Sequence, residues 1–190
     1  MMKHLLMIAL LVGTTVSIQA QQVANFALTN VGDGKVVSLD TYSSSAGVAI
    51  IFTSNACAFD DYYRSRIDKL SREYQDKVPV LLVNSNPDPL ETVDNMTRKA
   101  QQLNLNIPYL ADKDQALMKK LGASKSPQVF LLKNNGGKFS IVYRGAIDDN
   151  PQVEADVRHA YLKDAIDTLL TNQKVATPEV RPVGCTIRKK

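Results

Sequence analysis

The feature that most constrains the fold is an apolar run, residues 48–53, which breaks at residues 54–56 and leads to Cys57 and a stretch with helical periodicity. From Phe59 onward, apolar side chains recur at spacings of three and four as far as about Gln75, which predicts a buried strand, a tight turn and a helix. The Cys57 thiol would then lie among free backbone N–H groups at the positive end of the helix dipole, where the thiolate is favoured. Cys57 is therefore the candidate nucleophile. The alternative is a small apolar side chain buried at the turn.

Some of the charged residues that follow Cys57 raise the pKa of its thiol, and others lower it. Asp60 and Asp61 oppose the thiolate, whereas Arg64 is four residues beyond Asp60 and is expected to pair with it. An exposed pair of this kind contributes only about 0.3–0.5 kcal/mol. We therefore expect a moderately lowered pKa for the Cys57 thiol.

The N-terminal segment has the pattern of a cleavable secretory signal. Lys3 and His4 precede an apolar run at residues 5–12, and small residues lead to Ala20. The alternative is an uncleaved anchor, but the run is shorter than the ~20 residues that a spanning helix needs. We expect cleavage near Ala20 and a periplasmic or secreted protein that is not integral to a membrane, in a compartment where disulfides persist.

The rest of the chain is expected to form one domain, residues 21–172, followed by a polar tail, residues 173–190, that carries Cys185. No linker or repeat divides it. A formal net charge of +4 is too small to indicate a nucleic-acid partner. Two cysteines and a single histidine beyond the signal, His159, argue against a structural zinc site, and we expect no metal or other cofactor.

The remaining pattern alternates between strands and helices. We expect a hairpin or a pair of short strands at residues 26–29 and 35–39, and then a strand at 78–83 and a helix from about Pro89. A helix at 115–121 ended by Gly122, two strands at 129–132 and 139–143 joined by residues 134–137, and a final helix at 153–170 complete the expected order. This order, βαβα(α)ββα, predicts an α/β protein with a mixed sheet and helices on both faces.

Seven short motifs occur in an order that resembles the thioredoxin-like redoxins. They are Phe26-x-Leu28, residues 52–57 ending in Cys57, residues 81–86, Pro108-Tyr109-Leu110-x-Asp112, residues 126–132, residues 143–150 with Arg-Gly-x-Ile-Asp-Asp-Asn, and Gly184-Cys185-x-Ile187. More narrowly, the chain is similar to the alkyl hydroperoxide reductase/thiol-specific antioxidant group. The resemblance implies a thioredoxin-like fold, antioxidant oxidoreductase activity, and thiols, disulfides or peroxides as substrates, together with a redox-partner protein.

Two departures from the family pattern affect this expectation. The usual Cys-x-x-Cys is absent, because Asp60 stands three residues after Cys57. Peroxiredoxins carry a proline seven residues before their cysteine and a Thr or Ser three before it, whereas this chain has Ile50 and Ser54 there. Of these two positions, only the one with a hydroxyl matches the peroxiredoxin pattern. Ser54 is therefore a candidate, together with the backbone amides at the helix end, for stabilising the Cys57 thiolate.

Cys185 is the expected partner of Cys57, since the chain has no third cysteine and no resolving cysteine lies one turn away. It could resolve a mixed disulfide or sulfenic acid, or form a permanent bridge whose long loop would contribute at least about 4 kcal/mol in the chain-entropy model. A third alternative is an unpaired thiol on a mobile tail.

The family pattern also places a cis-proline before an apolar strand, with the preceding backbone facing the cysteine and binding an extended substrate. Ser126 and Pro127 stand there; the alternative is a proline that merely begins a strand. The sequence thus predicts an exported thiol–disulfide oxidoreductase or thiol-dependent peroxidase. The competing hypothesis is a non-catalytic binding module with a structural disulfide between Cys57 and Cys185.

Overall fold

The computed structural model of the chain describes residues 21–190, so the predicted signal peptide, residues 1–20, lies outside the described residues. Its strands are β1 (Gln22–Val23), β2 (Ala27–Asn30), β3 (Val36–Ser38), β4 (Gly47–Phe52), β5 (Val80–Asn84), β6 (Tyr109–Ala111), β7 (Lys125–Ser126), β8 (Gln128–Asn135), β9 (Lys138–Gly145), β10 (Glu179–Val180) and β11 (Cys185–Thr186). Its α-helices are α1 (Ala58–Tyr74), α2 (Val93–Gln102), α3 (Ala116–Leu121) and α4 (Tyr161–Leu170), and short 3-10 turns are η1 (Leu39–Tyr42), η2 (Pro89–Glu91) and η3 (Glu154–Asp156).

Strand β4 lies inside a mixed sheet whose order is β1-β9-β8-β4-β5-β6-β2-β3, with β10 added beside β9. It runs parallel to β5 and antiparallel to β8. All six of its residues are buried because both sheet faces are covered, which agrees with its continuous apolar sequence. The predicted α/β sheet with helices on both faces is confirmed.

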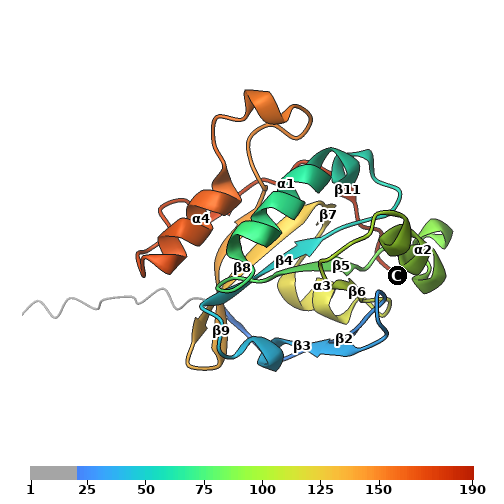
Figure 1. Cartoon of the computed structure of the whole chain (residues 1–190), viewed down its shortest axis with the longest axis horizontal. Helices are drawn as coiled ribbons and strands as arrows, with labels where there is room; N and C mark the ends of the chain where they lie inside the picture. The colour runs from blue at the N-terminus through green and yellow to red at the C-terminus, as the bar shows by residue number, and fades with distance from the viewer. Residues whose placement is uncertain (1–20) are drawn as a thin grey trace, which may run out of the picture.

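Side chains of β4 alternate between two apolar cores. Ala49 and Ile51 face the core that includes residues of α1, α2 and α4, whereas Val48, Ile50 and Phe52 face the core that includes residues of α3. Figure 1 shows α1 and α4 across one face of the sheet and α3 on the other. The turn between Phe52, where β4 ends, and Ala58, where α1 begins, therefore joins the sheet to the helix layer that holds α1 and α4.

Most of the predicted elements are present. The predicted hairpin of β8 and β9 is present, and it turns at Gly136 and Gly137, both with positive φ, as a two-residue turn requires. Gly122 ends α3 in the left-handed conformation, as predicted.

The final helix is shorter than the predicted range of residues 153–170, because α4 begins only at Tyr161. Asp149 explains the difference, since its backbone N–H donates to the carbonyl of His159 at 3.1 Å and its carboxylate accepts from the backbone N–H of Arg158 at 3.0 Å. These bonds hold residues 158–159 against the loop after β9 and out of the helix.

The C-terminal segment is paired with the domain by two short strands that the sequence did not indicate. β10 runs parallel to β9, and β11 pairs antiparallel with β7 in a separate two-stranded sheet. Among the helices of residues 21–190, none combines the length and the apolar composition that crossing a bilayer requires.

Candidate functional site

Cys57 is the residue that precedes the first turn of α1, at the end of the loop that leaves β4. Its backbone is extended, with φ −97° and ψ 119°, and its carbonyl accepts the N–H of Asp60 at 3.0 Å. Its side chain makes no capping hydrogen bond to the helix. The predicted position of the thiol at the N-terminus of a long helix is confirmed, and the positive end of the helix dipole favours a charged sulfur there.

Cys57 and Cys185 form a disulfide, with their Cα atoms 6.0 Å apart across 128 residues of sequence. The predicted pairing is confirmed, and the alternative of an unpaired thiol at Cys185 is wrong for this structure. Cys57 is 2% exposed, while Cys185 is half-buried. Of the two bridged residues, Cys185 is therefore the more exposed to solvent.

The peptide bond between Ser126 and Pro127 is cis, as the family resemblance implied. The carbonyl oxygen of Ser126 lies 3.2 Å from the Cys57 Sγ. In the disulfide this is a close contact, because the sulfur carries no hydrogen; in the reduced protein the thiol can donate to the same oxygen. The predicted placement of this backbone beside Cys57 is confirmed, and its role in binding substrate stays a prediction.

The loop before Cys57 is held by the carboxylate of Glu91, which the sequence did not indicate. Glu91 is 1% exposed and accepts from the Ser54 hydroxyl at 2.5 Å, the Asn55 N–H at 2.8 Å, the Ala56 N–H at 3.0 Å and the Asn84 side-chain amide at 2.7 Å. Four donors thus satisfy one buried carboxylate. Nothing in the local sequence of η2 shows that Glu91 faces a loop 35 residues away.

The hydroxyl of Ser54 donates to Glu91 rather than to a sulfur in the oxidised protein. Its oxygen also lies 3.4 Å from the N–H of Ala56. The expectation that Ser54 stabilises a Cys57 thiolate therefore concerns the reduced state and stays a prediction.

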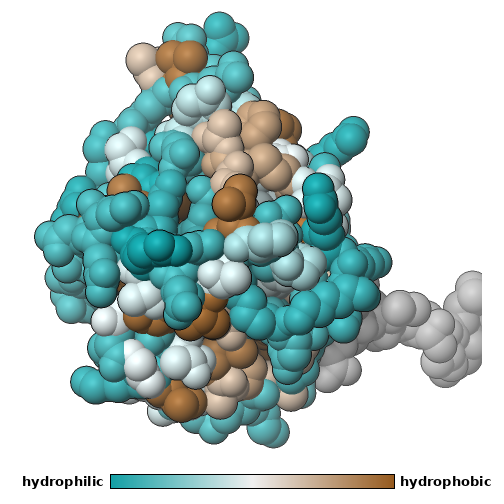
Figure 2. Space-filling model, turned by 90° about the vertical axis from the view of Figure 1, so that its right-hand side faces the viewer, coloured by the Kyte–Doolittle hydropathy of each residue, from teal (hydrophilic) through white to brown (hydrophobic). Residues whose placement is uncertain are grey.

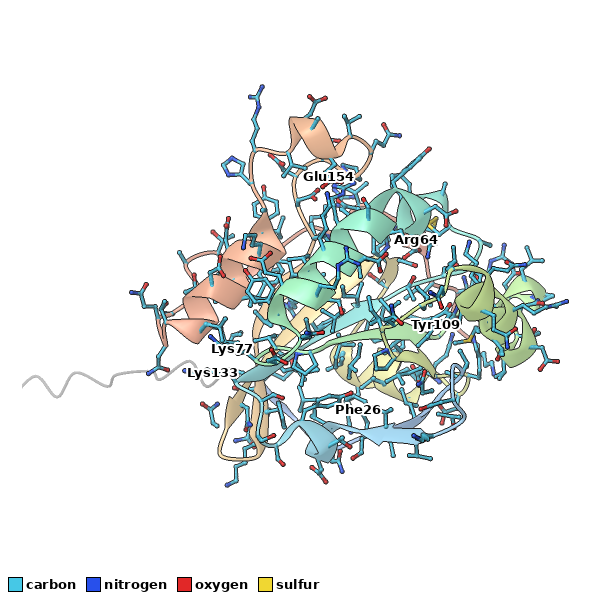
Figure 3. The ribbon with its side chains drawn as sticks, viewed as in Figure 1. Phe26, Arg64, Lys77, Tyr109, Lys133 and Glu154 are labelled. Atoms are coloured by element: carbon cyan, nitrogen blue, oxygen red, sulfur yellow. A yellow bond between two sulfur atoms is a disulfide. The ribbon has the colours of Figure 1, made fainter. Side chains whose placement is uncertain are left out.

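A second set of polar groups supports the same loop from β5 and β6. The Asn84 amide donates to the Tyr109 hydroxyl, which donates to the Asn55 side-chain oxygen, each at 2.8 Å. Burial raises the pKa of Tyr109. Burial also lowers the pKa of Lys113, which donates to Asn84 at 2.7 Å, to about 8. Tyr109 and Arg64, both labelled in Figure 3, line a small cavity beside this loop.

Asp60 is buried, at 5% exposure, in the place of a second active-site cysteine. Its carboxylate accepts from the hydroxyls of Thr53 at 2.8 Å and Ser126 at 2.5 Å, and from the backbone N–H of Ser54 at 3.2 Å. Burial raises its pKa to about 7, against the effect of these hydrogen bonds, and the charge of Glu91 acts in the same direction as burial.

The expected pairing of Asp60 with Arg64 is wrong. Arg64 instead donates to Asp61 at 2.7 Å, and Lys99 of α2 lies 3.2 Å from the same carboxylate. The first turn of α1 explains this, because Asp60 points inward to the hydroxyls of Thr53 and Ser126 while Asp61 faces solvent. Within residues 21–190, the Asp60 carboxyl group therefore has no arginine partner, and its hydrogen bonds come from Thr53, Ser54 and Ser126.

The arrangement joins two cysteines at a helix N-terminus, a backbone carbonyl against one sulfur, and a carboxyl group that titrates near neutral pH. Such a set can carry thiol–disulfide exchange. Within residues 21–190, no group of three or more His, Cys, Asp or Glu side chains is placed to hold a metal ion.

Comparison with known proteins agrees with this chemistry. Residues 20–143 match the model of the AhpC/TSA family. The chain belongs to the AhpC/TSA family. Cys185 and both C-terminal strands lie beyond the matched residues. None of the curated proteins matches the chain.

Solved structures of two uncharacterised proteins and of a thioredoxin are similar to this chain. An uncharacterized conserved protein from Geobacillus kaustophilus is 31% identical, with a TM-score of 0.81 over 90% of this chain and 92% of its own. A hypothetical protein from Sinorhizobium meliloti 1021 is 30% identical, with a TM-score of 0.80 over 92% and 96%. The exposed lipoprotein thioredoxin of Streptococcus pneumoniae is 23% identical, with a TM-score of 0.59 over 76% and 99%, and this likeness shows the fold.

Proposed function

We propose that this AhpC/TSA protein is an exported thiol–disulfide oxidoreductase in which Cys57 is the attacking thiolate and Cys185 the resolving thiol. The observation that carries the proposal is that the two cysteines of the chain are bonded to each other at the N-terminus of α1, beside the Ser126 carbonyl. The half-buried position of Cys185 also supports it, because exchange needs one sulfur that a partner can reach.

The reaction consists of two exchanges. The Cys57 thiolate attacks one sulfur of a substrate disulfide, forms a mixed disulfide, and releases the other substrate sulfur as a thiolate that takes up a proton. Cys185, as its thiolate, then attacks the Cys57 sulfur, forms the disulfide seen here and releases the second substrate thiol. The substrate gains two electrons, and a dithiol donor must reduce the protein before the next turnover.

Residues around the sulfurs have supporting roles in this proposal. Ser126 and Pro127 present the backbone against which a substrate lies, and the helix-end amides, with Ser54 once it leaves Glu91, stabilise the thiolate. Peroxide reduction is the related candidate, with Cys185 resolving a sulfenic acid on Cys57. The lack of the family's proline at position 50 favours disulfide exchange over peroxide reduction.

A structural bridge in a non-catalytic binding module is the second candidate. The observation in its favour is the almost complete burial of Cys57 in the oxidised protein. The two candidates differ in redox potential, because exchange proteins lie at about −120 to −270 mV and structural bridges below about −300 mV.

The deciding experiment combines a redox titration with the Cys185→Ser variant. If the bridge is catalytic, the potential falls in the exchange range and the variant accumulates mixed disulfides on Cys57. A structural bridge instead predicts a lower potential, no adducts, and a loss of about 2–5 kcal/mol of unfolding free energy in the variant. Peptide mapping of adducts identifies the sulfur that carries them.

Export is part of the proposal. It rests on the signal-like segment that ends near Ala20 and on the oxidised cysteine pair. The thioredoxin-like neighbour from Streptococcus pneumoniae is itself described as an exposed lipoprotein. N-terminal sequencing of the protein from a cell envelope fraction should begin near residue 21, and an intact N-terminus in the cytoplasmic fraction would contradict export.

A further inference from the structure

The last ten residues carry the excess positive charge of the chain. Residues 181–190 contain four arginines and lysines and no acidic residue, and the whole chain has a formal net charge of +4. Acidic and basic residues are therefore equal in number over residues 1–180. The imbalance lies in one short segment, and Cys185 stands in the middle of it.

This segment is held against the domain in the oxidised protein. β11 pairs antiparallel with β7, so that Thr186 lies opposite Lys125. Ile187 is 4% exposed, and its side chain belongs to the core on the α3 face. The side-chain amide of Gln115, which is fully buried, donates to the Arg188 carbonyl at 2.6 Å.

The approach of the tail to the strand beneath it is also close. A Cβ atom on Gly184 would lie 2.3 Å from the Ser126 carbonyl oxygen, so a side chain cannot be placed there without moving the strand. The next residue, Cys185, is bonded to Cys57. The basic side chains that flank Cys185 therefore keep a defined place as long as the bridge is closed.

Three basic residues flank the bridge on β7 and on the tail. The Lys125 ammonium group donates to the Thr186 hydroxyl at 2.9 Å, one residue from Cys185. Arg188 and Lys189 are exposed, and three residues of extended chain, about 10 Å, separate Arg188 from Cys185. We call Lys125, Arg188 and Lys189 the basic rim.

The charge of the basic rim is largely unpaired. In the part of the chain that the structure describes, its single salt bridge joins Arg188 to Asp88 at 3.6 Å, and the Arg188 side chain is 75% exposed. Lys69, by contrast, lies 2.6 Å from Glu154. An unpaired positive rim attracts anions over about one Debye length, ~8 Å at physiological ionic strength.

We propose that the basic rim docks the electron donor of this protein, and that the donor is a dithiol protein whose reactive thiols lie on an acidic surface. The proposal rests on the proposed oxidoreductase function and names the partner of its reductive step. The rim fits the donor better than the substrate, because the donor meets the oxidised protein, in which the tail is held, whereas the substrate meets the reduced one. Opposite charges across an interface raise the rate of encounter and orient the partner.

Apolar side chains beside the rim favour a protein partner. Val183, two residues before Cys185, is 50% exposed, and Leu90, two residues after Asp88, is 61% exposed. The end of the molecule that carries the C-terminus is seen face-on in Figure 2, with apolar surface among hydrophilic side chains. Protein interfaces combine apolar contacts of this kind with a polar rim.

Reduction of the bridge takes two exchanges. A donor thiolate attacks one sulfur of the bridge and forms a mixed disulfide, and the other cysteine leaves as a thiolate that takes up a proton. The second donor thiolate attacks the donor sulfur of the mixed disulfide, so the donor becomes a disulfide and the second cysteine leaves as a thiolate that is protonated. Two electrons pass from donor to protein.

The test compares dithiol peptides that differ only in charge. The oxidised mature chain is mixed with Glu-Glu-Cys-Gly-Ser-Cys-Glu-Glu, or with the same peptide carrying glutamine in place of every glutamate, and the reduced protein is separated and quantified over time. The rim variant combines Lys125→Gln, Arg188→Gln and Lys189→Gln.

A matched control loses the same charge elsewhere. It combines Lys77→Gln, Lys138→Gln and Lys174→Gln, all at exposed positions. Figure 3 shows Lys77 at the end of the molecule opposite the C-terminus that Figure 1 marks.

With the acidic peptide at low ionic strength, we expect the wild type to be reduced about tenfold faster than the rim variant, as electrostatic steering commonly achieves. The ratio should be several-fold smaller with the glutamine peptide, and the control should stay close to the wild type with both. Each ratio compares one peptide on two proteins, so the reactivity of the peptide thiols cancels. Raising the salt to about 0.5 M should remove most of the advantage. Lys189→Glu, a single exposed change, serves as the second variant if the triple one does not fold, and it should slow the acidic peptide by a few-fold.

The outcomes separate the two proposals. Equal rates for the wild type, the rim variant and the control would overturn the docking proposal and leave the oxidoreductase function standing. Equal rates together with binding of the wild type, but not of the rim variant, to phosphatidylglycerol vesicles would assign the rim to a lipid surface and overturn the docking proposal as well. A bridge that neither peptide reduces would overturn both.

Discussion

Replacing Asp60 with asparagine should stabilise the oxidised protein at pH 8 while changing little near pH 4. Asp60 is buried among three donors, from Thr53, Ser54 and Ser126, and burial raises its pKa to about 7 from an ordinary value of 3.8. A protonated carboxyl group and a side-chain amide each offer a donor and an acceptor, and the Thr53 hydroxyl can rotate to accept from either. Asparagine therefore imitates the protonated form.

The magnitude follows from linkage between protonation and folding. Below pH 3.8 the carboxyl group is protonated in both states, and between 3.8 and about 7 only the folded protein keeps the proton, so stability falls as the pH rises through this interval. At about 1.4 kcal/mol for each pKa unit, ionised Asp60 costs roughly 4 kcal/mol of unfolding free energy above pH 7. The asparagine side chain cannot ionise, so the Asp60→Asn variant escapes this cost.

Urea unfolding of the oxidised proteins at pH 4.5 and pH 8 measures the effect. The unfolding free energy of the variant relative to the wild type should rise by about 3 kcal/mol between these pH values. Asp61→Asn is the matched control on the next residue. Partial burial raises the pKa of Asp61, but hydrogen bonds from Arg64 and Lys99 outweigh it and lower the value, so this control should gain nothing at pH 8. A difference for Asp60→Asn that stays constant with pH would refute the reasoning.

Three further outcomes are expected. In the reduced protein, alkylation of Cys57 should show an apparent pKa below the ~8.5 of free cysteine, lowered further by Asp60→Asn; a value well above it would contradict the nucleophile assignment. Glu91→Ala leaves four donors without their acceptor and should cost at least about 3 kcal/mol in urea unfolding, against less than about 1 kcal/mol for the exposed Glu154→Ala, and equal losses would show that Glu91 does not hold the loop. Gly184→Ala should push β11 off Ser126 and make the disulfide easier to reduce in glutathione buffers, whereas an unchanged equilibrium would show that the tail does not depend on this close contact.

Local patterns in the sequence predicted the framework well. The apolar run of β4, the turn at Cys57 and the stripe along α1 are each encoded over consecutive residues, and so is the hairpin of β8 and β9. The partner of Cys57 was predictable because the chain offers a single other cysteine. The cis bond before Pro127 came from the family pattern rather than from local physics.

Contacts between distant residues were not predictable in the same way. Glu91 reaches the loop of Ser54 from another element, and no spacing rule relates the two positions. Strands β10 and β11 have two residues each, too few to show any alternation of apolar and polar side chains. Arg64 stands within reach of both Asp60 and Asp61 on a helix, and only the burial of Asp60 decides which of them it meets.

The 128-residue separation of the bridged cysteines has a consequence for the order of events during synthesis. Cys57 emerges from the ribosome long before Cys185, and β7, whose strand partner is β11, becomes paired only when the tail arrives. Throughout that interval the nascent chain holds a single thiol, open to capture by other molecules. Formation of the bridge then marks a chain that has been synthesised through its last strand and folded around it.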